Sequence, residues 1–169
     1  MIQAKLRECL KQSCLLVGIG NPLRGDDAFG PLVIEALRGN TKLPLLDVGS
    51  APENFIGPLT RTAPAHIILL DAVSLEAPPG SLHWLEPSEL EPSAVSTHAP
   101  SLDLLVSLIK QCSGETRVHI LGVVPSQVGF GDRLSDQTRQ AVEQVTSMIA
   151  QLAPPDQDPR TPCSPSDRD

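Results

Sequence analysis

The stretch that decides the fold is 18–30, which reads Gly-Ile-Gly-Asn-Pro-Leu-Arg-Gly-Asp-Asp-Ala-Phe-Gly. The apolar residues 15–17 precede it, and an amphipathic pattern over 27–38 follows it. Together these features predict a strand, a tight turn and the start of a helix. The glycines at 18, 20 and 25 allow backbone angles and close approaches that other residues resist. In α/β proteins such a turn lies at the carboxyl end of the sheet, where ligands bind.

This turn matches neither of two common nucleotide-binding motifs. In a dinucleotide fingerprint, Gly-x-Gly-x-x-Gly, the third glycine comes two residues earlier than Gly25 does here. A P-loop continues with lysine after its last glycine, whereas Asp26 and Asp27 follow Gly25. Two carboxylates repel a phosphate, so the turn suits a cation or a polar peptide group better. A simpler interpretation is that Asp26 and Asp27 merely cap the helix, although one of the two can cap while the other takes part in chemistry.

Composition narrows the class of protein. The 169 residues are enough for one compact domain, which we expect to cover 1–152. The net charge of −7 argues against nonspecific binding to nucleic acid or to an anionic membrane. No apolar stretch is long enough to cross a membrane, and residues 1–12 form an amphipathic helix pattern rather than a signal peptide.

The cysteines show no local metal-binding or redox motif. No two of them form a Cys-x-x-Cys pair, so neither a zinc ribbon nor a redox motif is indicated. Their scatter fits a reducing cytoplasm, which is the localisation that we expect. The four are Cys9, Cys14, Cys112 and Cys163.

Strand and helix patterns alternate along the chain. This alternation predicts a three-layer α/β/α domain with a mostly parallel, twisted sheet. A run at 82–85 after a Pro-Pro-Gly turn predicts one antiparallel edge strand. The other predicted strands cover 15–17, 43–48, 66–70 and 118–124, and the predicted helices 27–38, 52–60, 100–111 and 135–152. Residues 153–169 are rich in proline and hold no aliphatic residue larger than alanine, so we expect a disordered tail.

Three polar residues at the expected carboxyl rim of the sheet are candidates for one site. They are Asp27 in the turn, Asp71 at the end of the apolar run 66–70, and His98 after a polar loop. Two carboxylates and one imidazole suit a borderline divalent cation such as zinc or nickel. Each residue also has an ordinary structural explanation, because aspartates cap turns and a lone histidine is often a loop residue.

Five stretches of the chain occur together in one protein family. In this order they resemble the motifs of the hydrogenase maturation endopeptidases, over residues 15–152. The second stretch resembles the HycI branch, which serves hydrogen-evolving, formate-hydrogenlyase-type enzymes. The stretches are the turn at 18–30, Gly-Ser-Ala-Pro-Glu-Asn at 49–54, Leu-Asp-Ala at 70–72, Ser-Thr-His at 96–98 and Gly-Val-Val-Pro at 122–125.

The resemblance implies a specific activity and a specific site. Members of the family remove a carboxyl-terminal extension from the precursor of the nickel–iron hydrogenase large subunit, after nickel has been inserted. The metal-contacting residues of the family fall on Asp27, Asp71 and His98. The resemblance therefore implies nickel that the precursor supplies, no organic cofactor, and the precursor as protein partner. We expect a monomer without partners among nucleic acids or membranes.

The mechanism that follows is metal-assisted peptide hydrolysis. A cation at Asp27, Asp71 and His98 would polarise the carbonyl or acidify a water, and Asp26 would accept the proton or orient the water. Two alternatives remain open at this point. One is a nickel-binding or nickel-sensing module that cuts nothing, and the other is a metal-independent hydrolase that uses Ser96 and His98.

Overall fold

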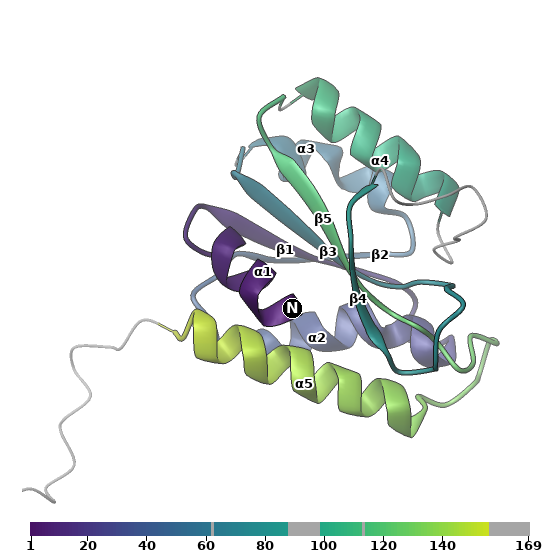
Figure 1. Ribbon diagram of the computed structural model, residues 1–169. Coiled ribbons are helices and arrows are strands. Elements are labelled where there is room, and N and C mark those ends of the chain that lie inside the picture. Colours follow the sequence, from purple (N-terminus) through teal and green to yellow (C-terminus); the bar gives the residue numbers. More distant parts are fainter. Residues whose placement is uncertain (62, 88–98, 113, 156–169) are drawn as a thin grey trace, which may run out of the picture.

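The computed structural model describes residues 1–61, 63–87, 99–112 and 114–155. Its centre is a five-stranded sheet in the order β2-β1-β3-β5-β4 (Figure 1). Four strands run parallel, and β4 pairs antiparallel with β5 at one edge. The strands are β1 (Cys14–Ile19), β2 (Leu45–Gly49), β3 (His66–Ala72), β4 (Leu82–Leu85) and β5 (Arg117–Val123).

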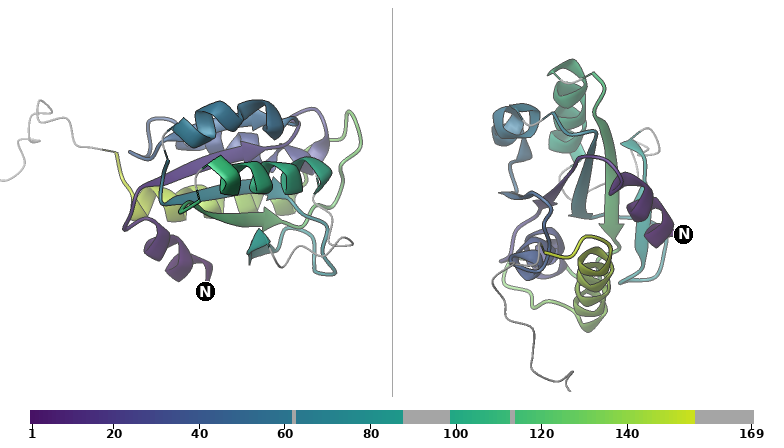
Figure 2. Two further views of the ribbon diagram at one scale, coloured as in Figure 1. Left: turned by 90° about the horizontal axis from the view of Figure 1, so that it is seen from above. Right: turned by 90° about the vertical axis from the view of Figure 1, so that its left-hand side faces the viewer.

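Helices cover both faces of this sheet, which gives three layers (Figure 2). One face carries α1 (Ile2–Cys9), α2 (Phe29–Leu37) and α5 (Asp136–Leu152). The other carries α3 (Ile56–Arg61) and α4 (Ala99–Cys112). Two 3-10 helices, η1 (Gly25–Ala28) and η2 (Pro52–Phe55), lead into α2 and α3. The predicted fold class, including the antiparallel edge strand, is confirmed.

Strand β3 lies in the middle of the sheet because its apolar side chains have to be covered on both faces. All seven of its residues are buried. Ile68 and Leu70 contribute to the core under α2 and α5, whereas Ile67 and Leu69 contribute to the core under α4. An apolar run of this kind without polar alternation is typical of a parallel strand that is covered on both faces.

The helix predicted over 27–38 differs from the observed one at its start. The chain first forms η1 and only then α2, and neither has a side-chain hydrogen bond at its N-cap. The expectation that Asp26 or Asp27 caps this helix is therefore wrong. The predicted cap of the last helix is confirmed, since Ser135 accepts a hydrogen bond from the backbone N–H of Thr138 (3.2 Å).

The carboxyl-terminal end of the domain is fixed by Ala153. This residue is buried, and its carbonyl accepts a hydrogen bond from Thr41 Oγ1 (2.6 Å). Most of the predicted tail, 156–169, lies outside the described residues. Among the helices that the structure does describe, none combines the length and apolarity needed to cross a membrane.

Candidate active site

The glycine turn presses helix α2 directly onto the ends of two strands. A Cβ at position 30 would collide with the carbonyl oxygens of Ile19 in β1 and Leu70 in β3. Gly20 has a φ of +138°, and a Cβ there would collide with the carbonyl of Asp27. Only glycine tolerates such angles and contacts. As a result η1, which carries Asp26 and Asp27, contacts β3 near the end that carries Asp71.

Asp27 and Asp71 are both almost completely buried, with 1% and 0% of their surface exposed. One carboxylate oxygen of each is held by a backbone N–H. Asn21 donates to Asp27 Oδ2 (2.9 Å), and Ala72 donates to Asp71 Oδ1 (2.8 Å). Hydrogen bonds of this kind fix the side-chain orientation of a carboxylate. The structure thus places two oriented carboxylates at the carboxyl rim of the sheet, on neighbouring elements.

The predicted third member of this site, His98, lies outside the described residues. The same is true of Ser96, the candidate nucleophile of the serine-hydrolase alternative. The helix that follows them, α4, begins at Ala99.

Asp26 points to different partners from its neighbour. Its Oδ2 accepts hydrogen bonds from Ser126 N (2.7 Å), Gln127 N (3.3 Å) and Ser135 Oγ (2.8 Å). Its Oδ1 accepts one from Ser135 N (2.8 Å). Asp26 is fully buried. Its hydrogen bonds join the turn to the loop between β5 and α5. The pattern of the sequence did not reveal this contact, because Asp26 and Ser135 are 109 residues apart.

The backbone N–H groups of the turn are largely used within the fold. Those of Gly20 and Asp26 donate to the carbonyls of Gly49 and Gln127, both at 2.9 Å. Those of Leu23 and Arg24 donate to the side-chain and backbone oxygens of Asn21. The turn therefore serves mainly to place η1 and its two aspartates.

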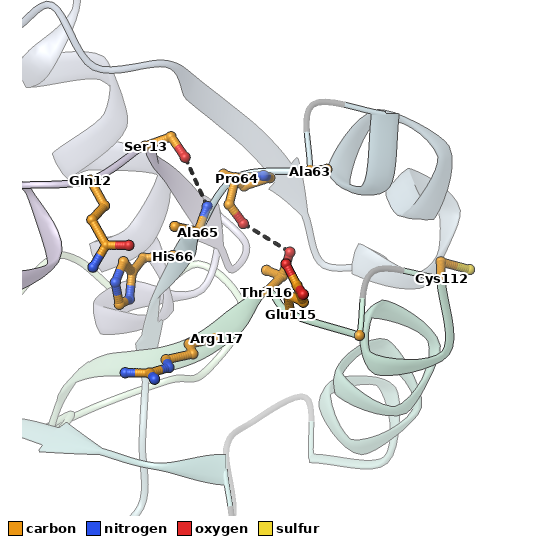
Figure 3. Close-up of a pocket in the computed structure, with 11 residues that line it drawn as sticks. Gln12, Ser13, Ala63, Pro64, Ala65, His66, Cys112, Glu115, Thr116 and Arg117 are labelled. Carbon is orange, nitrogen blue, oxygen red and sulfur yellow. Dashed lines mark hydrogen bonds between the residues drawn. The ribbon is translucent and has the colours of Figure 1, made fainter.

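A pocket of about 530 Å³ lies at the opposite end of the sheet (Figure 3). It is lined by residues just before, or at the first positions of, β1, β3 and β5, including Ser13, Pro64, His66 and Arg117. Hydrogen bonds from Ala65 N to Ser13 Oγ and from Thr116 Oγ1 to the Pro64 carbonyl hold its wall together. None of its lining residues belongs to the carboxyl rim, so this pocket is not part of the predicted peptidase site.

Comparison with protein families identifies the family of the chain. The family model for HycI, hydrogenase maturation protease, matches residues 31–152. The chain belongs to this family. The HycI-family chain is accordingly a peptide hydrolase, and the resemblance predicted from its five motifs is confirmed. The matched residues include positions 71 and 98, whereas the turn at 18–30 precedes the match.

Individual relatives support the same assignment. The HycI-family chain is 34% identical to the hydrogenase 3 maturation protease of Escherichia coli K12 over 136 residues, which are 78% of this chain and 85% of the relative. It superposes on the [NiFe] hydrogenase maturation protease HycI of Thermococcus kodakarensis with a TM-score of 0.79 and 29% identity, over 88% and 97% of the two chains. It superposes on the endopeptidase HycI of E. coli with a TM-score of 0.72 and 26% identity, over 82% of this chain and 90% of that one.

Proposed function

We propose that this HycI-family protease removes the carboxyl-terminal extension of the precursor of a nickel–iron hydrogenase large subunit after nickel insertion. Two relatives are named for the maturation of hydrogenases, one of them of the [NiFe] class, and a third is named an endopeptidase. The observation that carries the proposal is the pair of buried, oriented carboxylates at Asp27 and Asp71.

The chemistry of this pair fits a divalent cation. Buried carboxylates are stabilised by cations, and two carboxylates with an imidazole form a donor set of borderline hardness. We assign the imidazole to His98 on the family resemblance. A set of only three ligands leaves coordination positions for atoms that the substrate brings.

In this proposal the nickel belongs to the substrate. Asp27, Asp71 and His98 contact the nickel that the precursor carries, and this contact aligns the adjacent peptide bond. The bound cation supplies Lewis acidity for hydrolysis. The backbone donors at Asn21 and Ala72 hold the two carboxylates in place, so that little reorganisation is needed when the substrate arrives.

We assign Asp26 a positioning role in place of proton transfer. Four hydrogen bonds occupy its carboxylate, and all four come from the segment 126–135. A carboxylate in that setting holds the rim together and orients η1. Asp26 therefore acts on the reaction through the placement of Asp27.

Two exposed apolar side chains lie on the loops around this rim. Leu23 and Phe130 are 62% and 80% exposed, and the N–H of Gly131 donates to the carbonyl of Leu23 (2.8 Å). Exposed apolar side chains beside a catalytic rim suit contact with a protein substrate. We propose that they contact the precursor.

The substitution Asp71→Ala tests this function. It should reduce processing of nickel-loaded precursor by at least about a hundred-fold, because a metal-contacting carboxylate is lost. Processing is measured by intact mass spectrometry of the large subunit. The matched control is Asp47→Ala, since Asp47 lies in β2 beside Gly18 of β1 and is exposed.

The outcomes separate the three functional alternatives. Normal processing by Asp71→Ala would contradict the proposed site. Loss of processing in Ser96→Ala, with Asp71→Ala unaffected, would favour the serine hydrolase. A wild-type chain that binds nickel-loaded precursor without cutting it would favour the non-catalytic nickel module.

A further inference from the structure

A second group of metal-ligating side chains lies at the other end of the sheet. Cys9 at the end of α1, His66 at the start of β3 and His119 in β5 each offer one ligand atom, and these atoms lie within 4.8 Å of one another. All three residues are buried. We call them the Cys9–His66–His119 cluster. The cysteine spacing in the sequence gave no sign of it, because its members are 57 and 53 residues apart.

The two imidazoles of the cluster face each other through nitrogen atoms. His66 Nδ1 and His119 Nε2 are 3.0 Å apart, and the rings are stacked with centroids 5.2 Å apart. The other nitrogen of His119, Nδ1, lies 3.0 and 3.1 Å from the two oxygens of Glu86. A neutral His119 that donates from Nδ1 to Glu86 has its lone pair on Nε2, facing His66.

The surroundings of His119 match those of a metal-bound histidine. Histidine ligands of metals commonly donate their second nitrogen to a carboxylate, which fixes the ring and raises its basicity. Glu86 supplies that carboxylate here. Glu86 is itself positioned by Trp84, whose Nε1 donates to Oε1 (3.2 Å) and whose ring lies 5.2 Å from the ring of His119.

Burial disfavours the charged forms of Cys9 and His66. It raises the pKa of the Cys9 thiol, an effect to which the Glu86 and Glu8 carboxylates add. It lowers the pKa of His66, as do the nearby His119 and Arg117. Neutral imidazole is the form that binds a metal, and a cation next to the sulfur would favour the thiolate.

We propose that the Cys9–His66–His119 cluster is a binding site for Zn²⁺ or a similar borderline divalent cation. One thiolate and two imidazoles are a donor set that zinc favours. Two nitrogens bound to a tetrahedral zinc lie about 3.3 Å apart, and a nitrogen and a sulfur about 3.6 Å. The 3.0 Å between the imidazoles needs little change, and each distance from the sulfur to a nitrogen has to shorten by no more than about 1.2 Å.

Such a cation would join three parts of the fold. It would tie the amino-terminal helix α1 to the central strand β3 and to β5, on the face that α2 and α5 also cover. His66 also lines the pocket of Figure 3, so water or a small ligand from that pocket is the natural fourth ligand. This role does not depend on the proposed peptidase site at the opposite rim.

Cobalt binding tests the cluster directly. The full chain carrying Asp71→Ala, which removes a ligand from the carboxyl rim, is reduced and titrated with Co²⁺. We expect one Co²⁺ per chain with a thiolate-to-cobalt absorption band, and displacement of that Co²⁺ by Zn²⁺. Zn²⁺ at a hundred times its dissociation constant should raise the melting temperature by about 5–10 °C.

Cysteine variants in the same background identify the ligand. Cys9→Ser should lose the thiolate band and bind Co²⁺ at least about ten-fold more weakly. The matched control Cys14→Ser alters another buried thiol in the same part of the hydrophobic core. It should keep both the thiolate band and the Co²⁺ affinity. The band should also persist when Cys112 and Cys163 are replaced by serine.

Three results would overturn the proposal. They are the absence of a thiolate band, its persistence in Cys9→Ser, or equal loss in Cys14→Ser. In each case His66, His119 and Glu86 would form only a hydrogen-bond network. If Cys9→Ser fails to fold, His119→Gln replaces it, and unchanged Co²⁺ affinity in that variant would contradict the site equally.

Discussion

Strand β3 carries a candidate cation site near each of its ends, and the two sites differ in their sets of donor atoms. Asp71 lies toward the carboxyl end and His66 at the amino end, about 16 Å apart along the strand. At the carboxyl rim the described donors are carboxylate oxygens held by backbone N–H groups. At the other end the donors are a thiol and two imidazoles, and one of the imidazoles, that of His119, contacts Glu86 and Trp84.

This difference suggests different uses of a cation. A sparse set of carboxylates and one histidine binds a free borderline cation less firmly than a cysteine–histidine set. The rim is therefore suited to contact a metal that another molecule brings. The Cys9–His66–His119 cluster is suited to retain its own metal as part of the fold.

The carboxylates that support the two candidate sites are Asp26 at the carboxyl rim and Glu86 beside His119. They differ in burial, which predicts unequal effects on stability. Asp26→Ala removes a buried carboxylate that accepts four hydrogen bonds and should cost about 3–5 kcal/mol. We expect the melting temperature to fall by about 10 °C. Glu86→Ala should lower it by less than half as much, because the Glu86 side chain is 40% exposed. Both values come from calorimetry of metal-free protein.

A result in which Asp26→Ala keeps its melting temperature but loses processing would contradict the positioning role. It would restore Asp26 as a candidate general base. Equal losses of stability in the two variants would show that Glu86 supports the metal-free fold as strongly as Asp26 does.

Sequence patterns predicted most elements of the fold, and the chemistry of the rim stays a prediction. The apolar run of β3 and the glycine turn each determine their structure locally, and the family motifs included Asp27 and Asp71. The partners of Asp26 and the Cys9–His66–His119 cluster were not predictable in this way. Both depend on which face of the sheet each helix and loop covers, and residues more than 50 positions apart leave no local pattern.

The smallest expected effect concerns the proline-rich segment that follows Ala153. Deletion of 154–169 should change the melting temperature by no more than about 1–2 °C, because the segment has no Leu, Ile, Val, Met or aromatic side chain to bury. The truncated chain keeps Ala153, whose carbonyl binds Thr41. A drop well beyond this range would show that the segment packs on the domain.

We propose that side chains at the carboxyl rim recognise the precursor by contacting the nickel that it carries. The most direct measurement compares nickel-loaded and nickel-free precursor, each incubated with chelator-treated protease without added metal, and follows the mass of the large subunit. The account predicts cleavage of the nickel-loaded precursor and none of the nickel-free one. Efficient cleavage of nickel-free precursor, or activity that requires a metal held by Asp71 before the precursor binds, would contradict it and indicate an ordinary metalloprotease.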